Sequence, residues 1–204
     1  MLRPDLTTEK VLWSKGLSTI VGIDEVGRGS WAGPLVAAGV VLPQNFRLPK
    51  KLNDSKKITK SVREDLSEYI KTHAAQWYID KITQNQRDRL GITEATQQLF
   101  KKIIDSFKPE IDFALIDGFP LKSWSKSKQK AIIKGDQISA SIAAASIIAK
   151  VYRDNLMDQE STKYPEYGFK NHKGYGTKQH QQAIQNFGFC QIHRTSFNLK
   201  FLFS

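Results

Sequence analysis

Cysteine is almost absent from this chain of 204 residues, in which Cys190 is the only one. A single cysteine excludes a disulfide framework and a thiolate metal site, and it fits a reducing compartment such as the cytoplasm. Long apolar runs are also lacking. The longest apolar-rich stretch, residues 138–149, is interrupted by three serines and is too short to span a bilayer. The first residues contain no apolar core of signal-peptide length. We therefore expect a cytoplasmic protein that makes no contact with membranes.

Acidic residues are scarce relative to basic ones. The sequence contains 31 Lys and Arg against 20 Asp and Glu, which gives a formal net charge of +11 at pH 7. No acid follows Glu166, and the segment between Asp117 and Asp136 contains five lysines and no acid. A charge of this sign indicates a polyanionic partner, with nucleic acid preferred to membrane. A merely solvated surface is the alternative interpretation of both segments.

The length and the hydrophobic pattern indicate one α/β domain, since 204 residues are enough for one sizeable core and few for two. Apolar runs predict strands, and amphipathic or small-residue runs predict helices. The predicted strands cover 17–24, 35–42, 76–82, 111–116 and 131–133, and the predicted helices cover 61–72, 93–107, 138–157 and 177–186. A capping box at residues 61–64 is expected to open the first helix. This order favours a layered structure with a mixed sheet.

Three aspartates that are distant in the chain stand where predicted elements end or begin. Asp24 ends the first strand, Asp117 ends another, and Asp136 precedes the small-residue helix. Open α/β sheets place their sites at such positions. Clustered carboxylates repel one another unless divalent cations lie among them, so metal binding is the economical interpretation. For Asp117 or Asp136 taken singly, an ordinary turn or N-cap role is the alternative.

Glu25 follows Asp24 directly and presents a geometric question. Neighbouring side chains of a regular strand point to opposite faces. Both acids therefore serve one site only if the strand ends or bends there, or if Glu25 offers its backbone carbonyl, and the sequence leaves these possibilities open. A glycine-bracketed arginine, Gly27-Arg28-Gly29, comes next. Glycine lets a backbone approach a bulky anion, and the guanidinium fork matches phosphate, so the segment is typical of phosphate handling.

Six motifs in this order resemble bacterial ribonuclease HII, the type 2 ribonuclease H. They cover residues 22–29, 52–57, 116–118, 134–136, 145–154 and 172–177. The resemblance extends from about residue 20 to 197 and implies a ribonuclease H-like fold: a mixed five-stranded sheet flanked by helices, with a small C-terminal helical extension. It implies one catalytic domain over residues 1–204, with an N-terminal extension of about 16 residues and a basic extension from about residue 160.

The resemblance also implies a chemistry. The four matching carboxylates, Asp24, Glu25, Asp117 and Asp136, would hold two Mg²⁺ or Mn²⁺ ions. Two ions roughly 4 Å apart would flank the scissile phosphate, one activating water and the other stabilising the leaving oxygen. The implied substrates are the RNA strand of RNA–DNA hybrids and duplex DNA with an embedded ribonucleotide, cut on its 5′ side. The products would be a 5′-phosphate and a 3′-hydroxyl, and we expect the enzyme to act as a monomer.

Substrate contacts are implied in the same way. Gly27, Arg28 and Gly29 would read the ribose 2′-OH through the backbone, since this group distinguishes RNA from DNA. Tyr175 would stack on the sugar next to the RNA–DNA junction. Candidates for phosphate contacts are Lys56, Lys57 and Lys150, for which plain surface positions are the alternative. Three histidines, His172, His180 and His193, are interpreted as loop or backbone-contacting residues, and Arg153 with Asp154 as a structural pair.

The chain departs from the usual family pattern at Ser30 and Trp31, where proline and leucine are more common. Losing the proline predicts a freer turn, with an indole added near the site. The apolar tail after Asn198 is expected to pack on the core.

Three alternatives stay open at this stage. Ribonuclease HIII lacks the Gly-Arg-Gly run and carries an extra N-terminal domain, whereas about 16 residues precede the first predicted strand here. A ribonuclease H-like junction resolvase would share the acids but would not need the Gly-Arg-Gly run or Tyr175. A non-catalytic nucleic-acid-binding module would need no acids.

Overall fold

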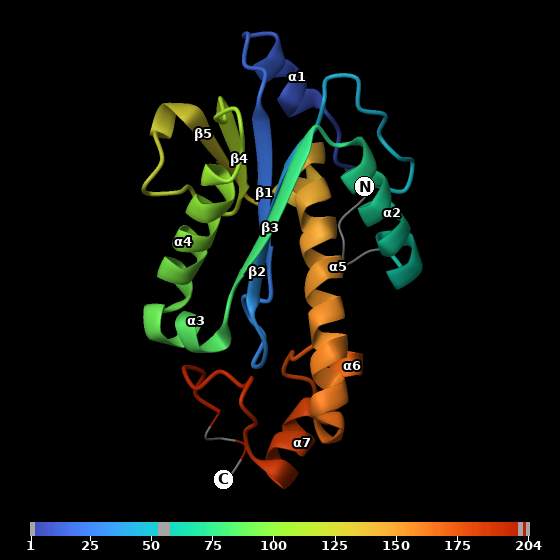
Figure 1. Ribbon diagram of the computed structural model, residues 1–204, viewed down its shortest axis with the longest axis vertical. Coiled ribbons are helices and arrows are strands. Elements are labelled where there is room, and N and C mark those ends of the chain that lie inside the picture. Colours follow the sequence, from blue (N-terminus) through green and yellow to red (C-terminus); the bar gives the residue numbers. More distant parts are fainter. Residues whose placement is uncertain (1–2, 53–57, 200–201, 203–204) are drawn as a thin grey trace.

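A computed structural model describes residues 3–52, 58–199 and 202. Its centre is a mixed sheet of five strands in the order β3-β2-β1-β4-β5 (Figure 1). The strands are β1 (Ile20–Val26), β2 (Leu35–Val41), β3 (Gln76–Ile82), β4 (Phe113–Asp117) and β5 (Gln129–Ile132). β2 pairs antiparallel with β1 and β3, while β4 pairs parallel with β1 and β5. The predicted mixed five-stranded sheet is confirmed.

Helices cover both faces of the sheet (Figure 1). The long helix α5 (Ala140–Lys163) and α2 (Lys60–His73) lie on one face, and α4 (Ile92–Asp105) lies on the other, with an apolar core under each layer. The shorter helices are α1 (Thr7–Trp13), α3 (Gln84–Leu90), α6 (Phe169–His172) and α7 (Lys178–Phe187), and 3₁₀ turns span Lys126–Lys128, Gly135–Gln137 and Pro165–Tyr167.

Two details of the helices differ from the prediction. The N-cap of α2 is Thr59, whose hydroxyl accepts the backbone N–H of Val62, so the capping box predicted at residues 61–64 is wrong. A capping box does open α3, where Thr83 and Gln86 exchange bonds. Helix α5 continues to Lys163, beyond the predicted end at residue 157.

Two glycines let the helices lie directly on the sheet. A Cβ added to Gly22 of β1 would lie 2.1 Å from the backbone carbon of Ser141 on α5. On the other face, a Cβ at Gly39 of β2 would lie 2.6 Å from a methyl group of Ile103 on α4. The close crossing at Gly22 brings the next turns of α5 against the end of β1, where the first predicted acids lie.

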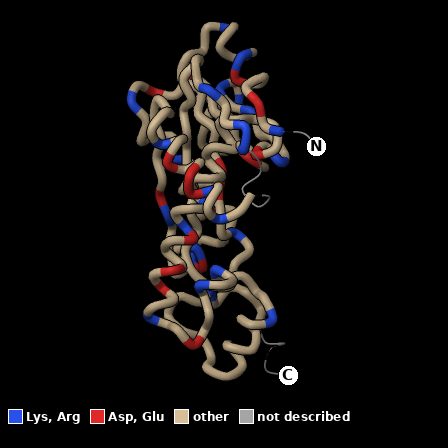
Figure 2. Tube along the Cα trace, turned by 90° about the vertical axis from the view of Figure 1, so that its right-hand side faces the viewer, with Lys and Arg blue, Asp and Glu red and all other residues tan. Residues whose placement is uncertain are grey.

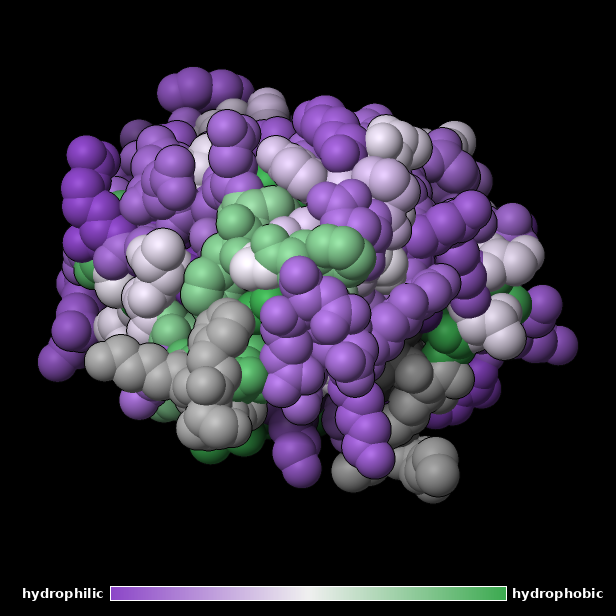
Figure 3. Space-filling view, turned by 90° about the horizontal axis from the view of Figure 1, so that it is seen from below, coloured by the Kyte–Doolittle hydropathy of each residue, from purple (hydrophilic) through white to green (hydrophobic). Residues whose placement is uncertain are grey.

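The C-terminal residues pack on the part of α5 that extends beyond the sheet (Figure 1). Leu199 and Leu202 are buried beside Ile184, with Trp31 at the edge of this cluster, so the predicted packing of the tail is confirmed for these two leucines. The other tail positions, Lys200, Phe201, Phe203 and Ser204, lie outside the described residues. Seen from this end, hydrophobic side chains gather in the middle of the face (Figure 3).

Basic residues are spread over the whole length of the molecule (Figure 2). The charge of +11 therefore does not form one block. Within the described part of the chain, none of the helices combines the length and the apolarity needed to cross a membrane.

Candidate active site

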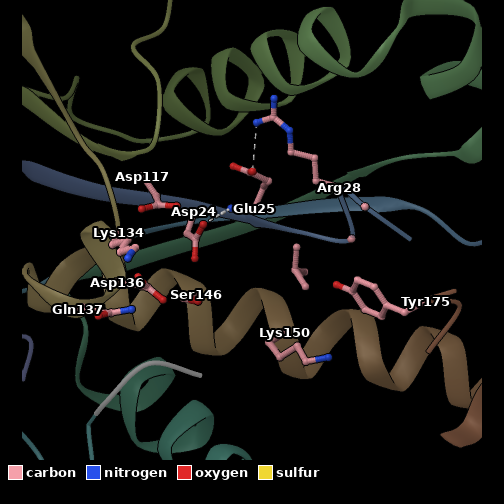
Figure 4. A pocket seen from close by; sticks show the side chains of 13 residues that line it. Asp24, Glu25, Arg28, Asp117, Lys134, Asp136, Gln137, Ser146, Lys150 and Tyr175 are labelled. Atoms are coloured by element: carbon pink, nitrogen blue, oxygen red, sulfur yellow. Dashed lines mark hydrogen bonds and ion pairs between the residues drawn. The ribbon is translucent and has the colours of Figure 1, made fainter. Parts of the chain in front are cut away.

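A cavity of about 610 Å³ opens at the carboxyl ends of β1 and β4 (Figure 4). These two strands are parallel, so their carboxyl ends meet at one edge of the sheet. Nine of the predicted site residues line the cavity: Asp24, Glu25, Gly27, Arg28, Gly29, Asp117, Asp136, Lys150 and Tyr175. The remaining two, Lys56 and Lys57, lie outside the described residues. We call Asp24, Glu25, Asp117 and Asp136 the acid cluster.

Asp24 is the most buried member of the acid cluster, with 6% of its surface exposed. Its Oδ1 accepts the backbone N–H of Glu25 at 2.7 Å. Burial raises the pKa of Asp24 well above its ordinary value, the charges of Glu25, Asp117 and Asp136 raise it further, and a hydrogen bond with Ser146 opposes them. A divalent cation among these carboxylates would reverse the unfavourable electrostatics.

Asp117 and Asp136 are brought together by a tight turn. The backbone N–H of Gly135 donates to Asp117 Oδ1 at 2.6 Å. A Cβ at Gly135 would lie 2.6 Å from a methyl group of Ile142, so a larger residue here would require that side chain to move. Asp136 follows directly in the 3₁₀ turn that leads into α5, and it is 8% exposed. One backbone segment thus orients both carboxylates.

Glu25 lies on the opposite face of β1 from Asp24. The strand does not end at Asp24 but continues to Val26, and Glu25 pairs with Ala37 of β2. The Glu25 carboxylate lies 3.6 Å from Arg28 Nη1 (Figure 4). Both residues also line a second cavity of about 340 Å³ beside α4, together with Phe119. The sequence left open whether the strand ends or bends at Asp24 or whether Glu25 offers its backbone carbonyl. The first of these, an end of the strand at Asp24, is wrong.

A ready-made metal site is not present among the residues that the structure describes, because no three His, Cys, Asp or Glu side chains are positioned to hold an ion as they stand. The oxygen chemistry of the acid cluster nevertheless suits Mg²⁺ or Mn²⁺.

The 27–34 turn that follows β1 is firmly held, so the predicted freedom of this turn is wrong. Ser30 is fully buried, and its hydroxyl donates to the Gly27 carbonyl at 2.9 Å. The backbone N–H groups of Trp31 and Ala32 donate to the Gly174 carbonyl at 2.8 and 3.2 Å. A hydroxyl thus makes a bond that proline lacks, and the turn is joined to the residue before Tyr175.

The indole of Trp31 lies against the other neighbour of Tyr175. A Cβ added to Gly176 would lie 2.3 Å from the Trp31 ring, so ring and backbone are in close contact. The predicted indole near the site is therefore a support for the Tyr175 segment.

Lys150 and Tyr175 meet on the α5 side of the cavity. Lys150 Nζ lies 5.8 Å from the centre of the Tyr175 ring and donates to Asp154 Oδ1 at 2.6 Å. Burial lowers the pKa of Lys150, and the bond with Asp154 opposes this. Asp154 also accepts a bond from Arg63 at 3.3 Å. The predicted structural pair of Arg153 and Asp154 is therefore wrong, since Asp154 pairs with Lys150 and Arg63.

The three histidines contact backbone, as predicted. His193 Nδ1 accepts the N–H of Cys190 at 2.9 Å, which leaves the proton on Nε2. That Nε2 lies 3.0 Å from Nε2 of His180, whose Nδ1 lies 3.0 Å from the Tyr175 carbonyl oxygen. The two neutral imidazoles of His193 and His180 thus form a chain of hydrogen bonds that ends on the Tyr175 backbone. We call this chain the histidine relay. Burial is the main cause that lowers the pKa of both His180 and His193 to about 4.

Sequence reasoning assigned no site role to four residues that line the cavity: Val26, Lys134, Gln137 and Ser146. Lys134 and Gln137 flank Gly135 and Asp136, so their closeness to a predicted acid is a usable signal. Ser146 is one serine within a run of small residues, and only its place in the 145–154 motif marks it.

Comparison with known proteins gives a consistent result. A family model described as Ribonuclease HII matches residues 21–200. The chain is 49% identical over 192 residues to a ribonuclease HII of Desulfitobacterium hafniense, covering 94% of this chain and 73% of that protein. It is 46% identical over 201 residues to one of Ruminiclostridium cellulolyticum, covering 98% and 78%. Among solved structures, the complex of PCNA and RNase HII from Archaeoglobus fulgidus is similar, with a TM-score of 0.74, 27% identity and coverage of 86% of this chain and 92% of that one.

Proposed function

The chain belongs to the ribonuclease HII family and is an endoribonuclease, and we propose that it cuts the RNA strand of RNA–DNA hybrids and cuts duplex DNA on the 5′ side of an embedded ribonucleotide. The products would carry a 5′-phosphate and a 3′-hydroxyl. The observation that carries this proposal is the convergence of the acid cluster, the 27–34 turn and Tyr175 on one cavity. Acids alone support phosphodiester hydrolysis, and the other two supply the means to select a ribonucleotide.

The residues present fit divalent cations. The acid cluster offers only oxygen donors, and neighbouring negative charges already disfavour the ionised form of Asp24. We propose that Asp24, Asp117 and Asp136 hold two Mg²⁺ or Mn²⁺ ions through their carboxylates. Glu25 would take part through its backbone carbonyl, since its carboxylate lies beside Arg28. When bound, the ions supply activation of water and stabilisation of the leaving oxygen.

Other residues of the chain bind and orient the substrate. Gly29 has open space around its Cα, which leaves room for a sugar to approach the backbone. Arg28 and Lys150 line the same cavity and bring positive charge to the strand that is cut. Tyr175 presents a ring for stacking on the sugar beside the junction. The bonds between the 27–34 turn and residues 174–194 support one catalytic domain over residues 1–204.

The proposal is tested by incubating the protein with a duplex DNA that carries one ribonucleotide, with and without Mg²⁺. Matched duplexes that contain no ribonucleotide, or an entire RNA strand, serve as comparisons. We expect cleavage 5′ of the ribonucleotide only with Mg²⁺, and mapping of the ends should give 3′-hydroxyl and 5′-phosphate. Equal cleavage of the all-DNA duplex, or of a branched DNA junction, would point to a resolvase-type enzyme instead.

A further inference from the structure

Arg153 is a charged residue that lies fully buried beneath the cavity, with 0% of its surface exposed. Its guanidinium makes four hydrogen bonds. Nε donates to the Pro34 carbonyl at 3.0 Å, and Nη2 donates to the Ala32 carbonyl at 3.0 Å and to Ser30 Oγ at 2.8 Å. Nη1 donates to the Lys173 carbonyl at 3.0 Å. Every acceptor thus belongs either to the 27–34 turn or to the segment that precedes Tyr175.

The fit of Arg153 against the turn is close. Gly27 has a φ of +90°, and a Cβ added there would lie 2.2 Å from Arg153 Nε. Ser30 completes this side of the arrangement, because its buried hydroxyl accepts from Arg153 and donates to the Gly27 carbonyl. The Arg153 guanidinium on one side and the Ser30 hydroxyl within the turn therefore fix the position of Gly27.

The same guanidinium defines the position of Tyr175. Its central carbon lies 5.4 Å from the centre of the Tyr175 ring, within the range of a cation–π contact. Lys173, which accepts from Nη1, has a left-handed backbone with φ of 53° and stands two residues before Tyr175. One rigid group thus touches both elements that are proposed to read the ribonucleotide.

Burying an arginine that bonds to carbonyl oxygens costs free energy, because its charge is removed from water. Apolar residues of similar size often stabilise a fold as well or better. The planar fork of arginine does offer several fixed donors at once. Such a group suits a place where two chain segments must keep a set separation.

We propose that Arg153 and Ser30 are positioning residues that hold the backbone of Gly27–Gly29 and the ring of Tyr175 at the spacing of one ribonucleotide and its neighbouring sugar. The proposal rests on the proposed function, because it assumes that these two elements read the substrate. Misplacement of about 1 Å is enough to slow a reaction roughly a hundredfold. Loss of one bond of this arrangement is therefore expected to slow cleavage as well as to destabilise the fold.

The test is a double-mutant cycle with Ser30→Ala and Tyr175→Ala, measured as single-turnover cleavage of a duplex with one ribonucleotide. We expect Ser30→Ala to lower the rate about tenfold. In the Tyr175→Ala background the same change should lower it less than about threefold, since the ring that Ser30 helps to position is gone. The dependence on Mg²⁺ concentration should stay as in the wild type. Thermal unfolding of each variant shows that the protein is folded.

Ser67→Ala is the matched control, because Ser67 is also a fully buried serine and its hydroxyl has no hydrogen-bond partner among the residues that the structure describes. This variant should cleave at the wild-type rate. Arg153→Lys keeps the charge but not the fork, and it should show the same coupling with Tyr175→Ala.

Two results would overturn the inference: a wild-type rate for Ser30→Ala, or equal losses from Ser30→Ala with and without Tyr175. Failure of the wild type to cut the single-ribonucleotide duplex would instead overturn the proposed function. The cycle would then be run on the RNA–DNA hybrid, where additive losses would still refute the positioning role.

Discussion

The acid cluster lies beside a second group of residues that differs from it in its electrostatics. We call this group the recognition block, and it consists of the 27–34 turn with Arg153, Tyr175, His180 and His193. In the acid cluster, burial raises the pKa of the Asp24 carboxyl, and the like charges around it raise that pKa further. In the recognition block, a buried guanidinium and neutral imidazoles are satisfied by carbonyl oxygens and by one another. The acid cluster gathers negative charge that a bound cation would balance, while the buried polar groups of the recognition block bond to carbonyl oxygens and to one another.

Substitutions in the two regions should therefore affect stability and function differently. Removing a charge from the acid cluster relieves repulsion, so it should harm turnover and spare or improve the fold. Removing a group from the recognition block leaves buried donors or acceptors unpaired, so it should harm both the fold and the selection of substrate.

The largest effect is expected from Asp117→Asn. The amide still accepts the Gly135 N–H but cannot offset the charge of a cation, so turnover should fall about a thousandfold or more. The free energy of unfolding in the absence of metal should stay equal or rise. Cleavage rates in Mg²⁺ and urea unfolding of the same preparation measure the two quantities. Cleavage at the wild-type rate would show that the acid cluster is wrongly assigned.

A strong pH effect is expected from the histidine relay. The folded-state pKa of His180 and His193 is lowered to about 4 from an ordinary 6.5, so the unfolded chain binds more protons between these values. Stability is therefore full above about pH 6.5 and is lost as the pH falls toward 4, by about 3 kcal/mol for one such group. Asp24 acts in the opposite direction, since a raised pKa favours folding as the pH falls.

Urea unfolding at pH 7.5, 5.5 and 4.5 measures this loss. His193→Gln, which removes one titrating ring from the relay, should be less stable at pH 7.5 and less dependent on pH. An unchanged pH dependence in this variant would mean that the relay is not the acid-sensitive part of the fold.

Tyr175→Ala should lower the rate at a single embedded ribonucleotide by about tenfold or more, because stacking of this kind contributes about 1–3 kcal/mol per base. The Mg²⁺ dependence should not change. Tyr175→Phe should be milder if the ring acts by stacking and as harmful as alanine if the hydroxyl is decisive. Single-turnover rates on the one-ribonucleotide duplex and on the hybrid give the comparison. Equal rates for the three proteins on the first substrate would remove Tyr175 from the site.

The smallest effect is expected from Lys134→Asn. Lys134 lines the cavity with a φ of 56°, a conformation that asparagine tolerates. Loss of one phosphate contact should weaken binding of all duplexes alike and reduce the slope of log affinity against log salt by about one unit. Lys15→Asn is the control, since Lys15 is exposed and precedes β1. A slope equal to that of the wild type would place the phosphate path elsewhere.

Much of the fold and of the acid cluster could be predicted from sequence because the signals are local. Strand β3 has the predicted bounds, Gln76–Ile82, and β2 ends one residue before the predicted end. Asp24 and Asp117 were expected at strand ends, and they meet because β1 and β4 are parallel neighbours in the sheet.

Several residues of the recognition block were expected at the site, but the contacts among them could not be predicted, because they join residues far apart in the chain. Arg153 and Ser30 are separated by 123 positions, and nothing near either residue indicates the other. Arg153 beside Asp154 suggests an ion pair by proximity, whereas each side chain of the helix points to a different neighbour. Likewise, the bond between His180 and His193 depends on how the tail folds back on α7.

The most direct test of the separation between the two regions is the binding preference of a protein that cannot cut. The affinity of Asp136→Asn for a duplex with one ribonucleotide and for the identical all-DNA duplex is measured without metal and compared with that of the wild type. If selection belongs to the recognition block, Asp136→Asn keeps the wild-type ratio of the two affinities while it cleaves neither duplex in Mg²⁺. Equal affinity of this variant for both duplexes, with a preference retained by the wild type, would contradict the account.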